Sequence, residues 1–441
     1  MNIQLSDHFN YKRLFHFTLP SVVMMIFTSI YGVVDGFFVS NLVGKTSFAA
    51  VNFVMPVLMI LGAIGFMFGA GGGALIAKTM GEGKHQKANE LFSLFIYTAI
   101  ICGVIITVFS LIFIRPILSL LGARGAMLES CVLYGRIVLT ALPLYMLQFE
   151  FQSFFITAGK PQLGLAVTVI SGVTNMVLDA LFMAVFSWGL AGAAAATALS
   201  QLIGGIVPLI YFGRPNTSLL RLTRFLYDGK SLLKACTNGS SELMSNISMS
   251  LVGMLYNVQL MRYAGEDGIA AYGVLMYVNM IFLAVFIGYS TGIAPVVGYH
   301  FGAGNRKELK NLLKKSSLII AVSSVCMFFV AEVFGSSLAG LFVGYDPTLF
   351  ALTKRAFMMY SFSFLFSGIA IYGSSFFTSL NDGLTSALIS FLRSLVFQIA
   401  AVILLPLVLG IDGVWISIVA AELVAAIVTL LFLVGKKAAY C

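Results

Sequence analysis

Twelve long apolar runs divide this chain, and each is long enough to cross a membrane. They fall near 14–40, 47–77, 91–115, 128–157, 161–186, 189–213, 236–263, 268–300, 315–343, 348–378, 383–410 and 411–435. A helix needs roughly 20 apolar residues to cross a hydrocarbon layer about 30 Å thick. None of the runs alternates between apolar and polar residues as the strands of an outer-membrane barrel do. We therefore expect an all-α integral membrane protein with twelve transmembrane helices.

Composition excludes several other classes of protein. Of 441 residues, 59% are hydrophobic and 10% are charged, whereas a soluble domain has about 25% charged residues. The net charge of +9 is spread over the segments between the runs, which favours contact with anionic lipid over nucleic acid. The five cysteines and four histidines lack metal-ligand spacing. We expect no nucleic-acid partner, no cofactor and no cluster of metal ligands.

The basic residues also predict the orientation in the membrane. With the N-terminus placed in the cytoplasm, eighteen Lys and Arg fall in cytoplasmic segments and six in outer loops, while Arg136 and Arg393 lie within spans. Cytoplasmic loops of membrane proteins carry such an excess of Lys and Arg. We therefore expect a multi-pass protein of the cell inner (plasma) membrane with both termini in the cytoplasm.

The chain also repeats itself after six spans. A shift of 221 residues places Gly71 on Gly292 and Gly81 on Gly302. An even number of spans gives both halves the same polarity, related by an axis along the membrane normal. We expect two pseudo-symmetric six-helix lobes, 1–213 and 236–441, joined by a cytoplasmic linker, 214–235, with a cavity between them. The sequence contains no Walker motif, so no ATPase subunit is expected.

An acidic residue within a span costs about 2.5–3.5 kcal/mol on insertion scales, so each needs a partner or a purpose. Asn175 and Asp179 are four apart, which places two oxygen ligands suited to a hard cation on one helix face. Thr197 either adds a hydroxyl or bonds back to its own helix. Asp35 either shares a pocket with Asp179 or lies near the outer headgroups. In a shared pocket, a cation or a proton must separate the two charges.

The remaining intramembrane acids are interpreted differently. Glu242 is expected either to cap the start of its helix or to contact substrate. Glu422 is expected to pair with Arg393 in a structural ion pair, and Glu150 and Glu332 are also interpreted as structural. Because the sequence shows no nucleophile, metal cluster or base cluster, we expect no catalytic residue and no enzyme.

Several motifs, in their order and spacing, resemble the multidrug and toxic compound extrusion (MATE) family over residues 17–435. They are Pro20 fifteen residues before Asp35, Asn175 with Asp179, Ala158-Gly159-Lys160-Pro161, Gly189-Leu190-Ala191-Gly192-Ala193-Ala194, and the glycine-containing loops at Gly81 and Gly302. The resemblance extends over nearly the whole chain, including the twelve spans in two repeats.

The resemblance implies a cation-binding site in the N-terminal lobe, formed by Asp35, Asn175, Asp179 and Thr197. Three further residues are implied as its neighbours: Tyr31, Tyr134 and Gln152. Gln152 stands where similar proteins often have asparagine, which leaves its role open. Another branch of the family has a coupling acid in the tenth span, but residues 355–380 contain none here.

The resemblance further implies that Pro20 is a hinge in the first span, although a proline at the start or end of a helix is the alternative. The function implied is a cation-coupled antiporter that exports amphipathic, often cationic organic compounds by alternating access, acting as a monomer. Na⁺ is favoured as the coupling ion and H⁺ is the alternative. Other candidates are a lipid-linked oligosaccharide flippase of the same superfamily and a membrane-embedded scaffold or sensor.

The orientation can be tested by labelling a single cysteine. In a cysteine-free background, Arg221→Cys should react with a membrane-impermeant thiol reagent only after the membrane is opened, because the linker is expected in the cytoplasm. Arg124→Cys, in a predicted outer loop, is the matched control and should react in intact cells. Labelling of position 221 from outside would overturn the topology.

Overall fold

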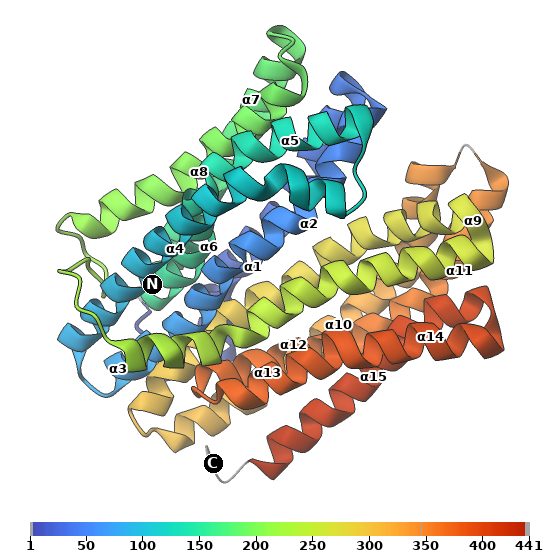
Figure 1. Ribbon diagram of the computed structural model, residues 1–441. Coiled ribbons are helices and arrows are strands. Elements are labelled where there is room, and N and C mark those ends of the chain that lie inside the picture. Colours follow the sequence, from blue (N-terminus) through green and yellow to red (C-terminus); the bar gives the residue numbers. More distant parts are fainter. Residues whose placement is uncertain (1–2, 345, 437–441) are drawn as a thin grey trace.

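The computed structural model describes residues 3–344 and 346–436, which form a bundle of helices without strands (Figure 1). The N-terminal lobe contains α1 (Tyr11–Phe38), η1 (Val39–Val43), α2 (Lys45–Met67), η2 (Phe68–Gly72), α3 (Gly73–Gly81), α4 (His85–Leu120), α5 (Gly125–Thr140), α6 (Leu142–Thr157), α7 (Pro161–Asp179), η3 (Ala180–Val185) and α8 (Gly189–Gly213). The C-terminal lobe contains α9 (Gly229–Gly302), α10 (Arg306–Val343), α11 (Pro347–Tyr360), η4 (Ser361–Ser363), α12 (Phe364–Ser379), α13 (Gly383–Phe391), η5 (Leu392–Val396), α14 (Phe397–Leu409) and α15 (Ile411–Gly435). Lys437 and Cys441 lie outside the described residues.

These elements make twelve membrane spans, as the hydropathy pattern predicts. Ten helices among the described residues are long and apolar enough to cross a bilayer, and α5 with α6, bent by 58°, makes one more. The 74-residue α9 contains two spans that meet at Gly265, whose φ of 60° and ψ of −147° are open to glycine alone at little cost. The predicted break between 263 and 268 falls at this residue.

The structure decides between the alternatives that the sequence left open for Pro20 and for Glu242. Pro20 lies inside the 28-residue α1 rather than at either end, so it removes a backbone hydrogen bond within the span. The helix that carries Glu242 begins at Gly229, and its N-cap is Asp228, which accepts a hydrogen bond from Ser231 N. A capping role for Glu242 is therefore wrong. Residues 229–235 of the predicted linker belong to this helix.

Asp228 also ties the linker to the N-terminal lobe. Hydrogen bonds from the Ser231 side chain and backbone, and then from Lys87, lower the pKa of Asp228 to about 2. Lys87 Nζ lies 3.0 Å from the Asp228 carboxylate. The start of the second lobe is thereby fixed to α4 of the first.

Two glycines that the repeat singles out form a pair of symmetry-related contacts between the lobes. A Cβ on Gly81 would lie 2.0 Å from Tyr299 O, and a Cβ on Gly302 would lie 2.0 Å from Lys78 O. The 221-residue shift that relates Gly81 to Gly302 also relates Lys78 to Tyr299. The repeated glycines therefore allow the second span of each lobe to approach its counterpart in the other.

A second pair of contacts joins the first span of each lobe to the second span of the other. A Cβ on Gly239 would lie 2.0 Å from Met67 O, and one on Gly71 would lie 2.1 Å from Ala235 O. In the symmetry-related contact, a Cβ on Gly288 would lie 2.6 Å from Val22 Cα. Backbone meets backbone at each of these points, as is typical of small residues at helix interfaces in membranes.

The segment before α1 also connects the two lobes at this end of the bundle. Leu5 and Phe9 are buried, and the buried Glu308 on α10 lies 2.6 Å from His8 Nδ1 and accepts a hydrogen bond from Phe9 N. Lys315 Nζ donates to Phe9 O. The first residues of the N-terminal lobe are thereby attached to the C-terminal lobe.

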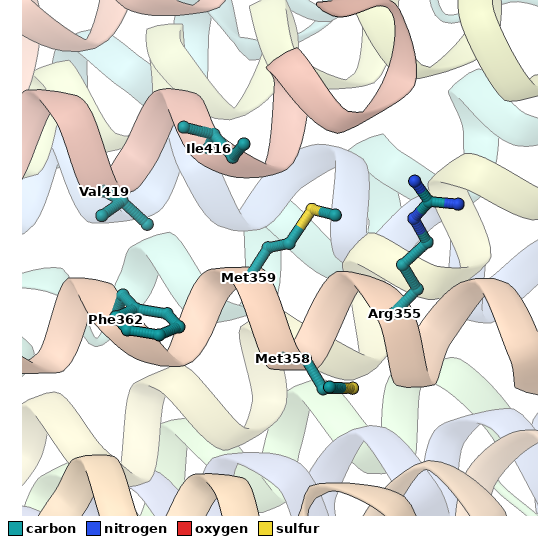
Figure 2. A pocket seen from close by; sticks show the side chains of 6 residues that line it. All are labelled: Arg355, Met358, Met359, Phe362, Ile416 and Val419. Carbon is teal, nitrogen blue, oxygen red and sulfur yellow. The ribbon is translucent and has the colours of Figure 1, made fainter.

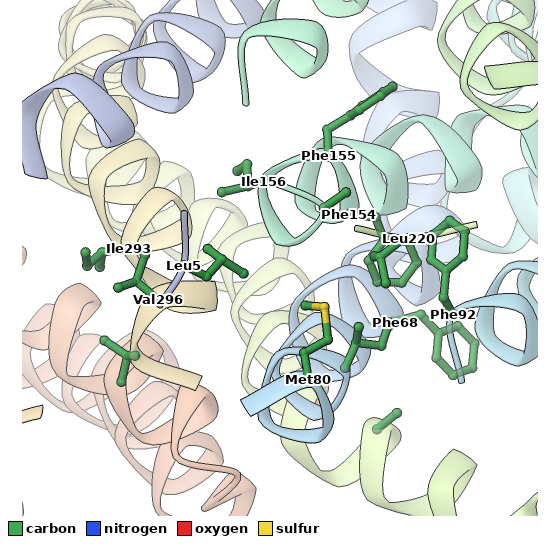
Figure 3. Packing of buried hydrophobic residues seen from close by; sticks show 14 of the residues in the cluster. Leu5, Phe68, Met80, Phe92, Phe154, Phe155, Ile156, Leu220, Ile293 and Val296 are labelled. Atoms are coloured by element: carbon green, nitrogen blue, oxygen red, sulfur yellow. The ribbon is translucent and has the colours of Figure 1, made fainter. Parts of the chain in front are cut away.

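One hydrophobic cluster crosses between the lobes at this end (Figure 3). It includes Phe68 and Met80 of the N-terminal lobe, Ile293 and Val296 of α9, and Leu5 from the segment before α1. Toward the opposite end the two lobes diverge, as Figure 1 shows. The bundle is thus closed at the end that carries the linker and open at the other.

The close helix contact can be tested with two glycines of the same helix. Gly239→Ala should lower the stability by about 1–3 kcal/mol, because the new methyl group must displace the Met67 backbone. Gly253→Ala is the matched control, since nothing lies within 4 Å of its added Cβ, and should be neutral or stabilising by up to about 1 kcal/mol. Thermal unfolding in detergent measures both. Equal midpoints would mean that the two lobes do not depend on this contact.

Candidate functional site

Asp35 and Asp179 meet in the interior of the N-terminal lobe. Helix α1 packs along α7, and the two carboxyl groups are close enough to interact electrostatically. Asp35 is 7% exposed and Asp179 is 0% exposed. The shared pocket, rather than the headgroup position, is therefore the environment of Asp35.

Neutral oxygen atoms surround this pair. Asn175, one turn before Asp179 on α7, is buried, and its Oδ1 has no hydrogen-bond partner. The Thr197 hydroxyl on α8 lies beside the Tyr134 hydroxyl on α5, although neither forms a well-directed hydrogen bond. Thr197 does not bond back to its own helix, so that alternative is wrong. Tyr134 also faces both acids.

Buried oxygen atoms without a hydrogen-bond partner are concentrated around these residues. Among the described residues of this lobe they belong to Ser21, Asp35, Tyr134, Gln148, Glu150, Gln152, Asn175, Asp179, Thr197 and Gln201. Leaving one buried polar group unsatisfied costs about 1–3 kcal/mol, and more for a charged group. Arg136, the basic residue within this lobe's spans, is exposed on α5 and supplies no counter-charge to the pair. The oxygens could be satisfied by a small hard cation or by protons on the carboxyl groups.

Gln148, which the sequence analysis did not single out, lies beside the Tyr31 hydroxyl. Gly204 on α8 leaves the space for it, because a Cβ there would lie 2.6 Å from the Gln148 side chain. Gln152 instead contacts Thr168 Oγ1, at 3.4 Å, about two turns before Asn175 on α7. Tyr31 and Asp35 share a face of α1. Gln148 is therefore the glutamine nearer to the acids. It lies four residues before Gln152, and this spacing was the feature of the sequence that could have identified it.

Both acids stand shortly before an irregular turn. The π-turn η3 follows Asp179 directly. The π-turn η1 begins four residues after Asp35, and the N–H of its first residue, Val39, donates to Asp35 O and Gly36 O. Single π-turns inside helices are frequent at functional sites.

The other intramembrane acids differ in how they are satisfied. Glu422 accepts hydrogen bonds from Arg393, as predicted, and Glu332 accepts one from the Ser361 hydroxyl. Glu150 is fully buried on α6 and has no hydrogen-bond or ion-pair partner among the described residues. Its interpretation as a structural acid therefore has no contact in support.

A groove of about 360 Å³ lies in the other lobe, between α11 and α15 (Figure 2). Its lining is apolar apart from Arg355, which bonds to Asp412. Figure 2 shows Met359, Ile416 and Val419 along it. This groove offers no oxygen ligands and lies apart from the acids of the N-terminal lobe.

Several known proteins are similar to this chain in sequence. The MatE family model matches the chain twice, at residues 20–181 and 243–404. The multidrug export protein MepA of Staphylococcus haemolyticus is 28% identical over 417 residues, covering 94% of this chain and 91% of the relative. MepA of Staphylococcus aureus is 25% identical over 422 residues, covering 96% and 93%.

Solved structures agree on the fold. A MATE protein crystallised with MaL6 has a TM-score of 0.93 and 23% identity, covering 98% of both chains. A multidrug resistance MATE family transporter in an outward-facing conformation has a TM-score of 0.93 and 24% identity, covering 100% of this chain and 98% of that one. The family model matches both halves of the repeat, and its members are membrane transporters rather than enzymes. This chain belongs to the MatE family.

Proposed function

We propose that this protein is a cation-coupled antiporter of the plasma membrane that exports amphipathic, often cationic organic compounds. The support for drug export comes from the MatE family and from relatives that are multidrug export proteins. The support for cation coupling is a single observation: Asp35 and Asp179 face each other without a neighbouring positive charge. A charge pair of this kind requires an exchangeable cation or proton.

The arrangement of the lobes supports alternating access. With both termini in the cytoplasm, the closed end of the bundle faces inward and the divergent end faces outward. Export then requires the contacts at Gly81, Gly302 and Glu308 to open while the opposite ends close. Pro20, within α1 and below Asp35, gives that helix a point at which to bend. A monomer contains both lobes and is proposed to be sufficient.

Sodium is the proposed coupling ion. A proton needs only a carboxylate, whereas a hard cation needs several oxygens at once. The buried Asn175 amide and Thr197 hydroxyl, both without partners, add neutral oxygens to the two carboxylates. A lipid-linked oligosaccharide flippase is less well supported, because the unpaired groups in this lobe are acids rather than the cations that hold phosphate.

The acids can be ranked by their effect on efflux. Asp35→Asn should reduce export of a cationic dye at least about tenfold, because it removes one half of the shared charge. Glu332→Gln should change export little, since glutamine still accepts the hydrogen bond from Ser361. Efflux from cells lacking other pumps, at matched expression, measures both variants. The opposite ranking would remove Asp35 from the coupling site.

The coupling ion can be tested in proteoliposomes. An imposed sodium gradient should drive dye in the opposite direction at fixed pH, and Asn175→Leu should weaken this dependence because it removes one oxygen ligand. Val173→Leu, on an exposed part of the same helix, is the matched control. If a pH gradient alone drove full exchange and Asn175→Leu were harmless, the pair would be a proton relay.

A further inference from the structure

The C-terminal lobe contains a second charged centre, built differently from the first. Arg393 stands on the π-turn η5, and its Nε lies 3.1 and 2.9 Å from the two carboxylate oxygens of Glu422 on α15. The two side chains are 16% and 7% exposed. Each charge is thus neutralised by the other within the membrane.

The ion pair uses only a small part of the arginine. A guanidinium group has five N–H donors, and only Nε–H is directed at Glu422. The two terminal nitrogens of Arg393 are not enclosed, and neither donates a hydrogen bond to a described residue. The end of the guanidinium group, with its two parallel donors, is therefore free to bind an anion.

The Arg393 side chain interacts with a residue that borders the space between the lobes. Glu242 on α9 interacts electrostatically with Arg393, and its half-buried carboxylate accepts no hydrogen bond from a described residue. Gly239, one turn earlier on the same helix, touches Met67 of the other lobe. Residues three apart share a helix face, so Glu242 lies on the side of α9 that faces the N-terminal lobe. Arg393 is consequently reachable from between the lobes.

The two lobes are not equivalent in charge. The 221-residue shift that relates the two lobes places Tyr256 and Ala400 where the N-terminal lobe has Asp35 and Asp179. The Tyr256 hydroxyl donates a hydrogen bond to the side-chain oxygen of Gln398. The C-terminal lobe thus lacks the pair of unpaired acids and has a partly free arginine instead.

We propose that Arg393 determines substrate specificity, binding the carboxylate of zwitterionic amphiphiles through its two terminal nitrogens. This inference rests on the proposed export function. The end of a guanidinium group matches a carboxylate in two parallel hydrogen bonds, which are among the stronger ones in proteins. Glu242 beside it carries the opposite charge, so a substrate with an ammonium and a carboxylate fits the site better than an anion alone.

A pair of dyes that differ only at the carboxylate tests this proposal. Rhodamine B is a zwitterion with a free carboxylate, and its ethyl ester is a cation. Arg393→Gln alone leaves Glu422 buried and unpaired, which destabilises the protein. The main variant therefore combines Arg393→Gln with Glu422→Gln. We expect it to bind rhodamine B at least about tenfold more weakly while its affinity for the ester changes less than about threefold. Fluorescence polarisation of the purified protein measures both affinities.

Two further variants separate specificity from structure. Arg393→Lys keeps the charge but loses the fork of donors, and should weaken binding of the acid more than that of the ester. Arg355→Gln, which removes an arginine of the same lobe that pairs with Asp412, should affect neither dye.

Equal weakening of both dyes by the double variant would reduce Arg393 and Glu422 to a structural pair, and unchanged binding of both would exclude Arg393 from the substrate site. Either result overturns the inference while leaving export by the unmodified protein intact. If the unmodified protein exported neither dye in proteoliposomes, the proposed function would fail for this class, and the inference would fail with it.

Discussion

Two carboxyl groups facing each other inside a membrane protein need a positive charge between them, and the N-terminal lobe provides none of its own. Asp35 and Asp179 come from α1 and α7, and the side chains around them contribute only neutral oxygens. In a medium of low dielectric constant, the pair is stable only when a cation or proton occupies it. In the proposed function, the cation or proton that neutralises the pair must also be able to leave, so that the state of α1 depends on an ion from solution.

The C-terminal lobe shows the alternative solution to the same physical problem. Its intramembrane acid Glu422 is paired with Arg393, and Tyr256 and Ala400 stand at the positions that the 221-residue shift relates to Asp35 and Asp179. A common fold therefore supports two kinds of charged centre. The first is proposed to bind an ion from solution, and the second contains its own ion pair and an arginine that is proposed to bind a ligand.

The contacts that hold the two lobes together are made mainly by backbone and small residues. Gly81 with Tyr299, Gly302 with Lys78, and Gly239 with Met67 are all approaches that a methyl group would obstruct. Water does not drive helices together within a bilayer, so close packing supplies the attraction. Contacts of this kind can separate without exposing charged side chains. The hydrogen bonds of Phe9 with Glu308 and Lys315 add a polar contact between the lobes at the end of the bundle that carries the linker.

The sequence by itself determined the twelve spans, their breaks and the repeat, and predicted a set of candidate cation-binding residues, because hydropathy, glycine and charge act over a few residues at a time. It also paired Glu422 with Arg393, since these were the two opposite charges available in that lobe.

Only the tertiary structure decided which side chains meet. It brought Asp35 to Asp179 rather than to the headgroups, placed Gln148 instead of Gln152 beside Tyr31, and turned Arg136 outward. It also showed that Glu242 does not cap its helix, which begins at Gly229. The physical reason is that these outcomes depend on the rotation and separation of neighbouring helices, which are set by close packing between distant parts of the chain and leave no mark on local periodicity.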